Sequence, residues 1–303
     1  MDVLATPDEV RTWVRERRRQ AYRIGLVPTM GCLHNGHLSL VRLAHQRAEA
    51  VVLSLFVNPI QFGPSEDLAG YPRDLERDRQ LCAEAGVEAL FCPSTDAMYP
   101  AGHSTFVEET RISQALCGAR RPGHFRGVAT IVAKLFNLVQ PDVAVFGQKD
   151  AQQARVIRQM VRDLDFPVEI IVGPIVREAD GLAMSSRNQY LDAGERRQAL
   201  CLSRALDCAA RRVAAGEHET AELIAAMREE IAGAPQARVD YVEIVDNATL
   251  APVTTLIRPA LALLAVYVGR TRLIDNAVLT PVTTQASGFR VREIPALPTL
   301  ILP

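Results

Sequence analysis

The chain has 303 residues, of which 48% are hydrophobic and 23% are charged, and its formal net charge is −1. This composition is typical of a folded, water-soluble protein with one large or two medium domains. The balanced charge gives no basic field for nucleic acid or a membrane surface, and we expect neither partner. No apolar run approaches the roughly 18 residues that a spanning helix needs.

The N-terminus and the cysteines both favour a cytoplasmic protein. The first residues, MDVLATPDEV, contain no charged segment followed by an apolar core, so we expect no signal peptide. The six cysteines are scattered without a C-x-x-C pair, a pattern that fits neither a zinc ribbon nor a disulfide framework. We therefore expect reduced thiols. The basic run RERRR at 15–19 favours a solvated helix face over a nucleic-acid patch.

Short apolar runs alternate with amphipathic stretches over the first part of the chain. Strands are expected at 24–29, 50–57, 87–92, 143–147 and 168–174, and helices at 36–48, 72–85, 125–139 and 150–164. The run AVVLSLFV at 50–57 is almost wholly apolar, which is typical of a parallel strand covered on both faces. This alternation predicts an α/β fold with an open, Rossmann-like parallel sheet and right-handed crossovers.

The pattern changes near Arg187. Two helices are expected at 192–215 and 220–232, followed by strands at 239–246, 260–269 and 272–279. These elements predict a smaller C-terminal α+β domain. We divide the chain into a Rossmann-like domain at 1–187, the smaller domain at 188–283 and a Pro-rich tail at 284–303.

Polar loops follow four of the predicted parallel strands. Ligands of such sheets bind beyond the carboxyl ends of the strands. The loops are TMGCLHNGH after the first strand, NPIQFG after the second, GQKDAQQ after the fourth and VREADGLAMSSRN after the fifth. Their concentration on one rim predicts a ligand site there.

Three interpretations are open for His34 and His37. A zinc-protease helix would place the two histidines four apart with Glu after the first, whereas here the spacing is three and Asn35 takes that position. A surface turn capped by histidine is a second interpretation. The third is phosphate binding, because Gly31 and Gly36 let the backbone approach a ligand and the helix N-terminus points its N–H groups there.

The other rim loops offer donors that are weak signals one at a time. Ser185, Ser186 and Arg187 are compact donors for a polyphosphate, although Ser-Ser-Arg is usually a turn or a helix cap. Lys149 is either a point charge for phosphate or half of a surface ion pair. The neutral amides Asn58, Gln61 and Gln153 suit a hydroxyl or a carboxylate; the alternative for the Asn-Pro pair is a turn.

Taken together, these motifs resemble the pantothenate synthetase family. The segments that carry the resemblance are PTMGCLHNGH, FVNPIQF, YPRDLERD, RPGHFRGVATIVAKLFNLVQPD, FGQKDAQQ, GLAMSSRNQYL, YVEIVDNATL and GRTRLIDN, in that order, over about residues 24–279. The resemblance implies an ATP-dependent ligase that joins pantoate to β-alanine. Pantoate would attack the α-phosphate of ATP to give pantoyl adenylate and pyrophosphate, and β-alanine would then displace AMP.

The resemblance also implies roles for individual residues. Phosphate binding and catalysis would fall to His34, His37, Lys149, Ser185, Ser186 and Arg187. The same residues would bind ATP together with Met30, Gly147, Asp150, Val176 and Met184. Pantoate would be bound by Asn58, Gln61 and Gln153 with Arg121 beside them, an arginine that could instead serve pyrophosphate or β-alanine.

The family's chemistry implies further features. Mg²⁺ should accompany ATP, held by phosphates and water, with Asp78 the only protein ligand considered. The polar loop at 63–71 is a candidate lid that would shield the adenylate from water. The family is typically dimeric, which implies a homodimer. Two departures from the family pattern, Gln148 and Ala151, affect local packing and not the reaction.

Two rival functions are weighed against the ligase. A nucleotidyltransferase that moves AMP to a phosphorylated acceptor would share the histidines and the Ser-Ser-Arg loop, but would need extra basic residues after the second strand. A catalytically silent ATP- or nucleic-acid-binding module would not need all the phosphate-binding residues together.

Overall fold

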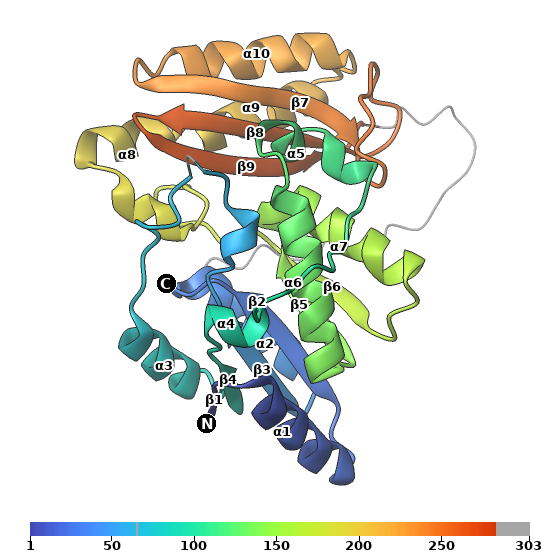
Figure 1. Ribbon diagram of the computed structural model, residues 1–303. Coiled ribbons are helices and arrows are strands. Elements are labelled where there is room, and N and C mark those ends of the chain that lie inside the picture. The colour runs from blue at the N-terminus through green and yellow to red at the C-terminus, as the bar shows by residue number, and fades with distance from the viewer. Residues whose placement is uncertain (65, 283–303) are drawn as a thin grey trace.

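The computed structural model describes residues 1–64 and 66–282, which contain two β-sheets (Figure 1). The larger sheet has six strands in the order β1-β4-β3-β2-β5-β6, and every pairing in it is parallel. Its strands are β1 (Asp2–Leu4), β2 (Ile24–Thr29), β3 (Ala50–Leu55), β4 (Ala89–Phe91), β5 (Val143–Gly147) and β6 (Glu169–Gly173). The smaller sheet is antiparallel, with β7 (Ala237–Asp246), β8 (Ala260–Val268) and β9 (Thr271–Leu279). The predicted fold class is confirmed.

Helices connect the strands and cover both sheets. The α-helices are α1 (Pro7–Arg19), α2 (Asn35–His45), α3 (Leu75–Glu84), α4 (Thr95–Met98), α5 (Cys117–Arg120), α6 (His124–Val139), α7 (Ala151–Asp163), α8 (Ala193–Ala199), α9 (Cys201–Ala214) and α10 (Thr220–Ala232). Short 3₁₀ turns in the described residues are η1 (Pro59–Gln61), η2 (Ile112–Gln114), η3 (Gln148–Asp150) and η4 (Ser186–Tyr190). Within residues 1–64 and 66–282, none of these helices combines the length and apolar character that a bilayer crossing requires.

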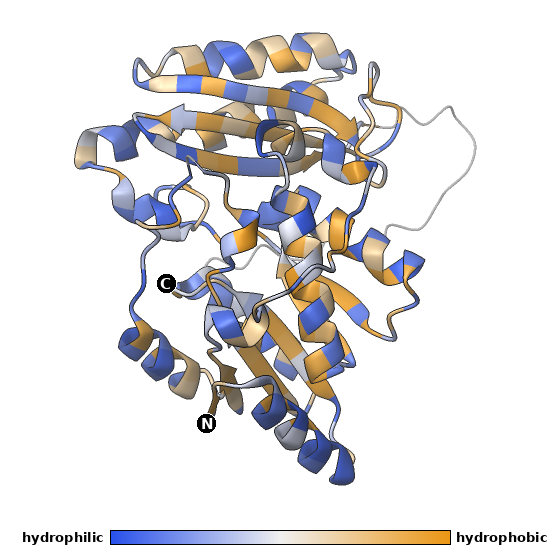
Figure 2. Cartoon of the chain, viewed as in Figure 1, coloured by the Kyte–Doolittle hydropathy of each residue, from blue (hydrophilic) through white to orange (hydrophobic). Residues whose placement is uncertain are grey.

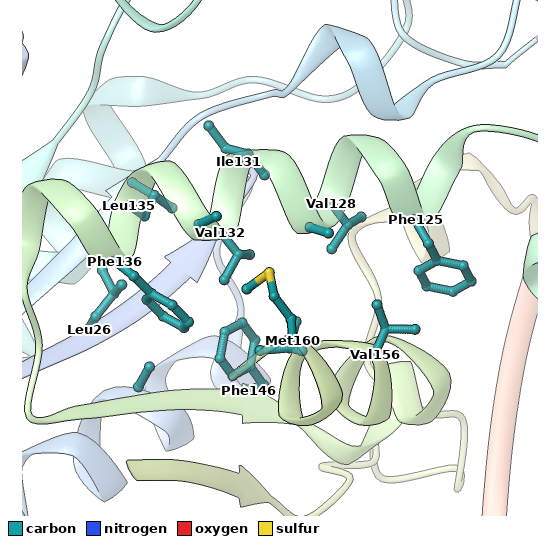
Figure 3. Close-up of a cluster of buried hydrophobic side chains, with 14 of the residues drawn as sticks. Leu26, Phe125, Val128, Ile131, Val132, Leu135, Phe136, Phe146, Val156 and Met160 are labelled. Carbon is teal, nitrogen blue, oxygen red and sulfur yellow. The ribbon is translucent and has the colours of Figure 1, made fainter. Parts of the chain in front are cut away.

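Helices cover both faces of the parallel sheet. Successive side chains of a strand point to opposite faces, so both sets are buried. On β2, Leu26 packs with residues of α1, α6 and α7, whereas Val27 packs with residues of α2 and α3. Figure 3 shows the first of these layers, in which Val132 and Phe136 of α6 point toward Phe146 of the sheet. This two-sided burial explains the continuous apolar runs in the sequence.

The small sheet lies between α9 and α10 on one face and the large domain on the other (Figure 1). Val242 and Leu264 pack with α9 and α10, whereas Tyr241 and Leu263 belong to the same core cluster as α6 and α7. Figure 2 shows polar residues interspersed with apolar ones along β7, which forms one edge of this sheet. The two sheets are therefore joined through a shared apolar layer.

Several element boundaries differ from the predictions. The predicted helix at 72–85 begins only at Leu75, because the Asp74 carboxylate accepts the N–H of Arg77 and caps it there. The predicted helix at 192–215 is two helices, α8 and α9, divided at Leu200. Strand β1 was not predicted, and α1 extends the helix face expected at 15–19 back to Pro7, where Thr6 and Glu9 form the capping box that begins it.

The division of the chain into domains stays our proposal, with the boundary after Arg187. The expected Pro-rich tail at 284–303 lies outside the described residues. The order of the large sheet reverses between β2 and β5, which are neighbours although β3 and β4 follow β2 in the chain. A reversal of this kind opens a crevice at the carboxyl ends of the two strands, where ligands of such sheets bind.

Candidate active site

The loop between β2 and α2 is held by one buried carboxylate of α3. Asp78, which is 1% exposed, accepts the backbone N–H groups of Cys32 and Leu33, each at 2.7 Å. Gly31 lies in the left-handed region at φ +86°, where L side chains are strained. The loop therefore enters α2 in a fixed conformation. Both oxygens of Asp78 accept backbone N–H groups, so this carboxylate supports the loop and is poorly placed as a ligand for Mg²⁺.

His34 and His37 form the cap of α2. Nδ1 of His34 accepts the N–H of Gly36 at 3.2 Å, and Nδ1 of His37 accepts the N–H of His34 at 3.3 Å. The two rings stack with their centroids 4.0 Å apart. Since a neutral imidazole has one donor and one acceptor nitrogen, the free Nε2 of each ring carries the proton. Two N–H donors thus sit at the positive end of a helix dipole.

Both histidines of this pair are neutral at neutral pH. Burial, followed by the nearby Lys149 ammonium, lowers the pKa of His34 to about 4. Burial is also the largest cause that lowers the pKa of His37 well below its usual value, with His34 and Lys149 adding to it. The rings therefore act as hydrogen-bond donors and carry no full positive charge until a ligand brings negative charge close to them.

A cluster of neutral side chains lies after β3. The amide nitrogen of Asn58 donates to Oε1 of Gln61 at 3.0 Å and to the carbonyl oxygen of Gly127 at 3.1 Å, and its oxygen accepts from Tyr99 at 2.8 Å. The Gln61 amide nitrogen lies 3.0 Å from the sulfur of Met30. Asn58 is thus locked by its partners, and it fixes the orientation of the Gln61 amide.

The loop after β5 is attached to the small sheet. Asn276 of β9 donates to the carbonyl oxygens of Gln148 and Lys149, each at 3.0 Å, and accepts from the Gln148 amide at 2.9 Å. The ammonium of Lys149 lies 3.7 Å from the Asp150 carboxylate. The backbone of Lys149 is therefore positioned by a residue of the other sheet.

The Ser-Ser-Arg loop faces the candidate lid. Ser186 donates to the carbonyl oxygen of Cys32 at 3.1 Å, which ties this loop to the histidine loop. Arg187 is held by Asp67 through Nε at 3.0 Å and Nη2 at 2.8 Å. One residue earlier, Glu66 accepts two hydrogen bonds from Arg121, at 2.7 and 2.6 Å. Two arginines expected to bind anionic substrates thus pair with two adjacent carboxylates of 63–71.

Two connected cavities lie at the carboxyl ends of the parallel strands. The smaller, about 210 Å³, is lined by all fifteen predicted site residues: Met30, His34, His37, Asn58, Gln61, Arg121, Gly147, Lys149, Asp150, Gln153, Val176, Met184, Ser185, Ser186 and Arg187. The larger, about 800 Å³, lies between the large domain and the small sheet. The two cavities share wall residues, among them Arg121, Lys149 and Arg187.

The structure adds residues to this site that the sequence did not single out. His124 lines both cavities, and Tyr99 reaches Asn58 from a segment without clear periodicity. The motif RPGHFRGV contains His124, so its position there was a usable signal. The pairing of Glu66 and Asp67 with arginines had no local signal, because each ion pair joins segments far apart in the sequence. Within residues 1–64 and 66–282, no group of three or more His, Cys, Asp or Glu could hold a metal ion.

Known proteins resemble this chain over most of its length. A family model described as pantoate-beta-alanine ligase matches residues 2–278. A pantothenate synthetase of Moorella thermoacetica is 58% identical over 273 residues, which cover 90% of this chain and 96% of the relative. The chain belongs to the pantoate-beta-alanine ligase family. The resemblance noted in the sequence is therefore confirmed.

Solved structures of the family agree with the fold. The pantothenate synthetase of Thermus thermophilus matches with a TM-score of 0.89 at 48% identity, covering 93% of this chain and all of that one. The pantoate-beta-alanine ligase of Francisella tularensis, solved with beta-gamma ATP and beta-alanine, matches with a TM-score of 0.76 at 33% identity, covering 92% of this chain and 97% of that one. Because sequence and structure comparisons both identify this family, the chain is an enzyme of the ligase class.

Proposed function

We propose that this chain joins D-pantoate to β-alanine in two steps through a pantoyl adenylate. In the first step a pantoate carboxylate oxygen attacks the α-phosphorus of ATP, and the bond to the β,γ-pyrophosphate breaks. In the second step the uncharged amine of β-alanine attacks the acyl carbon, AMP leaves with the bridging oxygen, and the nitrogen loses a proton. The observation that carries the proposal is the pair of Nε2–H donors of His34 and His37 in one cavity with neutral amides.

The chain needs no nucleophile of its own for this reaction, because the pantoate carboxylate is already ionised. Its contribution is to position the reactants and to offset the charge that develops on the phosphates. Phosphate binding falls to the six residues His34, His37, Lys149, Ser185, Ser186 and Arg187. Nucleotide binding adds Met30, Gly147, Asp150, Val176 and Met184.

Pantoate is assigned to the neutral part of the cavity. Gln61 and Gln153 present amides there, Asn58 fixes Gln61, and Arg121 supplies the positive charge that a carboxylate or pyrophosphate would meet. An amide pair suits the hydroxyl groups of pantoate better than ammonium groups would, because it orients them without excess charge. This chemistry distinguishes the site from one built for a phosphorylated acceptor.

Mg²⁺ is proposed to enter with ATP, where it offsets phosphate charge. Since the described residues offer no carboxylate cluster, its ligands would be phosphate oxygens and water, which suits its preference for retained waters. A homodimer and a cytoplasmic location are likewise proposed, on the resemblance of the chain to its family and on its scattered cysteines.

The decisive experiment is AMP formation from ATP and D-pantoate, with and without β-alanine, by the wild type and by His34→Ala. We expect sustained AMP release to need both substrates and kcat to fall about 10²- to 10³-fold in the variant, as for other lost transition-state donors. His218→Ala, which changes a histidine of the small domain, is the matched control and should keep full activity. AMP transfer to a phosphorylated acceptor, or ATP binding without turnover by folded wild type, would overturn the proposal.

A further inference from the structure

His124, the first residue of α6, contacts both Arg121 and the turn that carries Gln61. It is 9% exposed. Its Nε2 lies 3.0 Å from Nη1 of Arg121, and its Nδ1 lies 2.9 Å from the carbonyl oxygen of Gln61. The proposed reaction gives His124 no role, yet both of its partners line the cavity.

The geometry fixes which ring nitrogen carries the proton. A guanidinium can only donate, so Nε2 of His124 must accept from Arg121. A carbonyl oxygen can only accept, so Nδ1 must donate to Gln61. The ring is therefore neutral and in the Nδ1–H form. Burial, followed by the charge of Arg121, lowers its pKa to about 4, which agrees with this protonation state.

The turn that carries Gln61 rests directly on the first turns of α6. A Cβ atom at Gly127 would lie 2.6 Å from Cα of Gln61 and 2.6 Å from the carbonyl oxygen of Ile60, so only glycine permits this approach. The amide of Asn58 donates to the carbonyl oxygen of Gly127. The start of α6 is thus the common support of the amide cluster and, through His124, of Arg121.

The remaining donors of the Arg121 guanidinium are fixed by a second partner. Its Nε and Nη2 donate to Glu66 of the candidate lid, which leaves Nη1 for His124. When the lid carboxylate moves away, His124 is the contact that keeps the guanidinium directed at the cavity.

We propose that His124 is a positioning residue that sets the separation between the Arg121 guanidinium and the Gln61 turn, so that both engage one pantoate molecule. This inference rests on the proposed function. It predicts that the two hydrogen bonds of His124 matter separately, and that both matter for pantoate and not for ATP.

Two isosteric variants separate the two bonds. In His124→Asn the amide nitrogen takes the place of Nδ1 and keeps the bond to Gln61, but nothing reaches Arg121. In His124→Gln the amide oxygen takes the place of Nε2 and keeps the bond to Arg121, but the bond to Gln61 is lost. We expect each variant to lower kcat/KM for pantoate about tenfold, the usual scale for one lost hydrogen bond to a charged or buried group. The KM for ATP should stay within about twofold.

The experiment measures KM for each substrate and the thermal midpoint of the full-length protein. His218, whose Nδ1 also contacts a backbone carbonyl, that of Leu256 at 3.2 Å, provides matched controls as His218→Asn and His218→Gln. A double-mutant cycle adds the sharpest result: in an Arg121→Ala background, His124→Asn should cause no further loss.

The outcomes separate the possibilities. A rise in the KM for pantoate alone, absent in the Arg121→Ala background, supports the positioning role. Unchanged pantoate kinetics, or equal losses for ATP and pantoate with a lowered thermal midpoint, would overturn it in favour of a structural histidine. Failure of the wild type to make pantothenate would instead overturn the proposed function, and it is read from the same assay before any variant is compared.

Discussion

At the scale of single residues, the buried histidines of the cavity link folding stability to pH. The pKa of His34 and that of His124 are each lowered to about 4 by burial, whereas an unfolded histidine titrates near 6.5. Above pH 6.5 both states are neutral and the full stability is present. Between pH 6.5 and 4 only the unfolded state takes up these protons, so stability falls as pH falls, by at most about 1.4 kcal/mol per pH unit and histidine.

We therefore expect the urea midpoint to fall steadily from pH 6.5 to pH 5. Burial raises the pKa of the Glu66 and Asp67 carboxylates, but their arginine partners outweigh it and lower the pKa of each, so these two groups take up protons below this window. His124→Gln removes one of the buried imidazoles and should give a shallower slope than the wild type in the same titration. An unfolding midpoint that does not vary over this range would contradict the assignment of these rings as buried and neutral.

At the scale of elements, the segment 63–71 is attached to the site by ion pairs with two arginines that are proposed to bind the substrates. Arg187 is paired with Asp67, and Arg121 with Glu66. If Arg187 is to hold the phosphates of ATP, it must exchange the carboxylate of Asp67 for them. Asp67→Asn weakens the competing pair, so the KM for ATP should fall a few-fold, in keeping with the modest value of an ion pair that water still reaches.

Steady-state kinetics at low and moderate salt test this exchange. Glu76→Gln, which removes an exposed carboxylate that pairs with Arg79 on α3, is the matched control and should leave the KM for ATP unchanged. An increase in the KM for ATP in Asp67→Asn would mean that the pair persists in the substrate complex and helps to hold the lid closed.

At the scale of the whole molecule, the small sheet completes the site of the large domain. Asn276 binds the carbonyl oxygens of Gln148 and Lys149, and Asn247 accepts from Arg155 of α7. Both asparagines join the same two units, but only Asn276 touches the loop of Lys149. Asn276→Ala should lower the free energy of unfolding by about 1–3 kcal/mol, because it leaves buried polar groups unpaired, whereas Asn247→Ala removes an exposed side chain and should cost less.

The two variants should differ in catalysis. Asn276→Ala is expected to raise the KM for ATP several-fold, because the backbone of Lys149 loses its support, whereas Asn247→Ala should leave it near the wild-type value. Chemical denaturation and initial rates on the same preparations provide both readouts. Equal catalytic effects of the two substitutions would show that the small sheet acts on the site only through overall stability.

The parallel sheet and the polar loops at its carboxyl edge could be predicted from the sequence, because both depend on local patterns. Continuous apolar runs mark strands buried on both faces, and polar loops after them mark the carboxyl ends. All fifteen predicted site residues line one cavity, although their roles stay proposals. The ion pairs of Glu66 and Asp67 were beyond such patterns, since each joins residues at least 55 positions apart. Strand β1 was missed because three residues are too few for a period to appear.

The contact of Gly127 with η1 also limits how this site can diverge. Because no side chain fits between α6 and the backbone of Gln61, the spacing of these two segments is set by bare main chain. Evolution or protein design can exchange the side chains that face the cavity, such as Gln61 or Met30, to recognise another acid. It cannot widen the cavity at this wall without rebuilding both segments together. The backbone thus sets the size of an acceptor at this wall, and the side chains choose its chemistry.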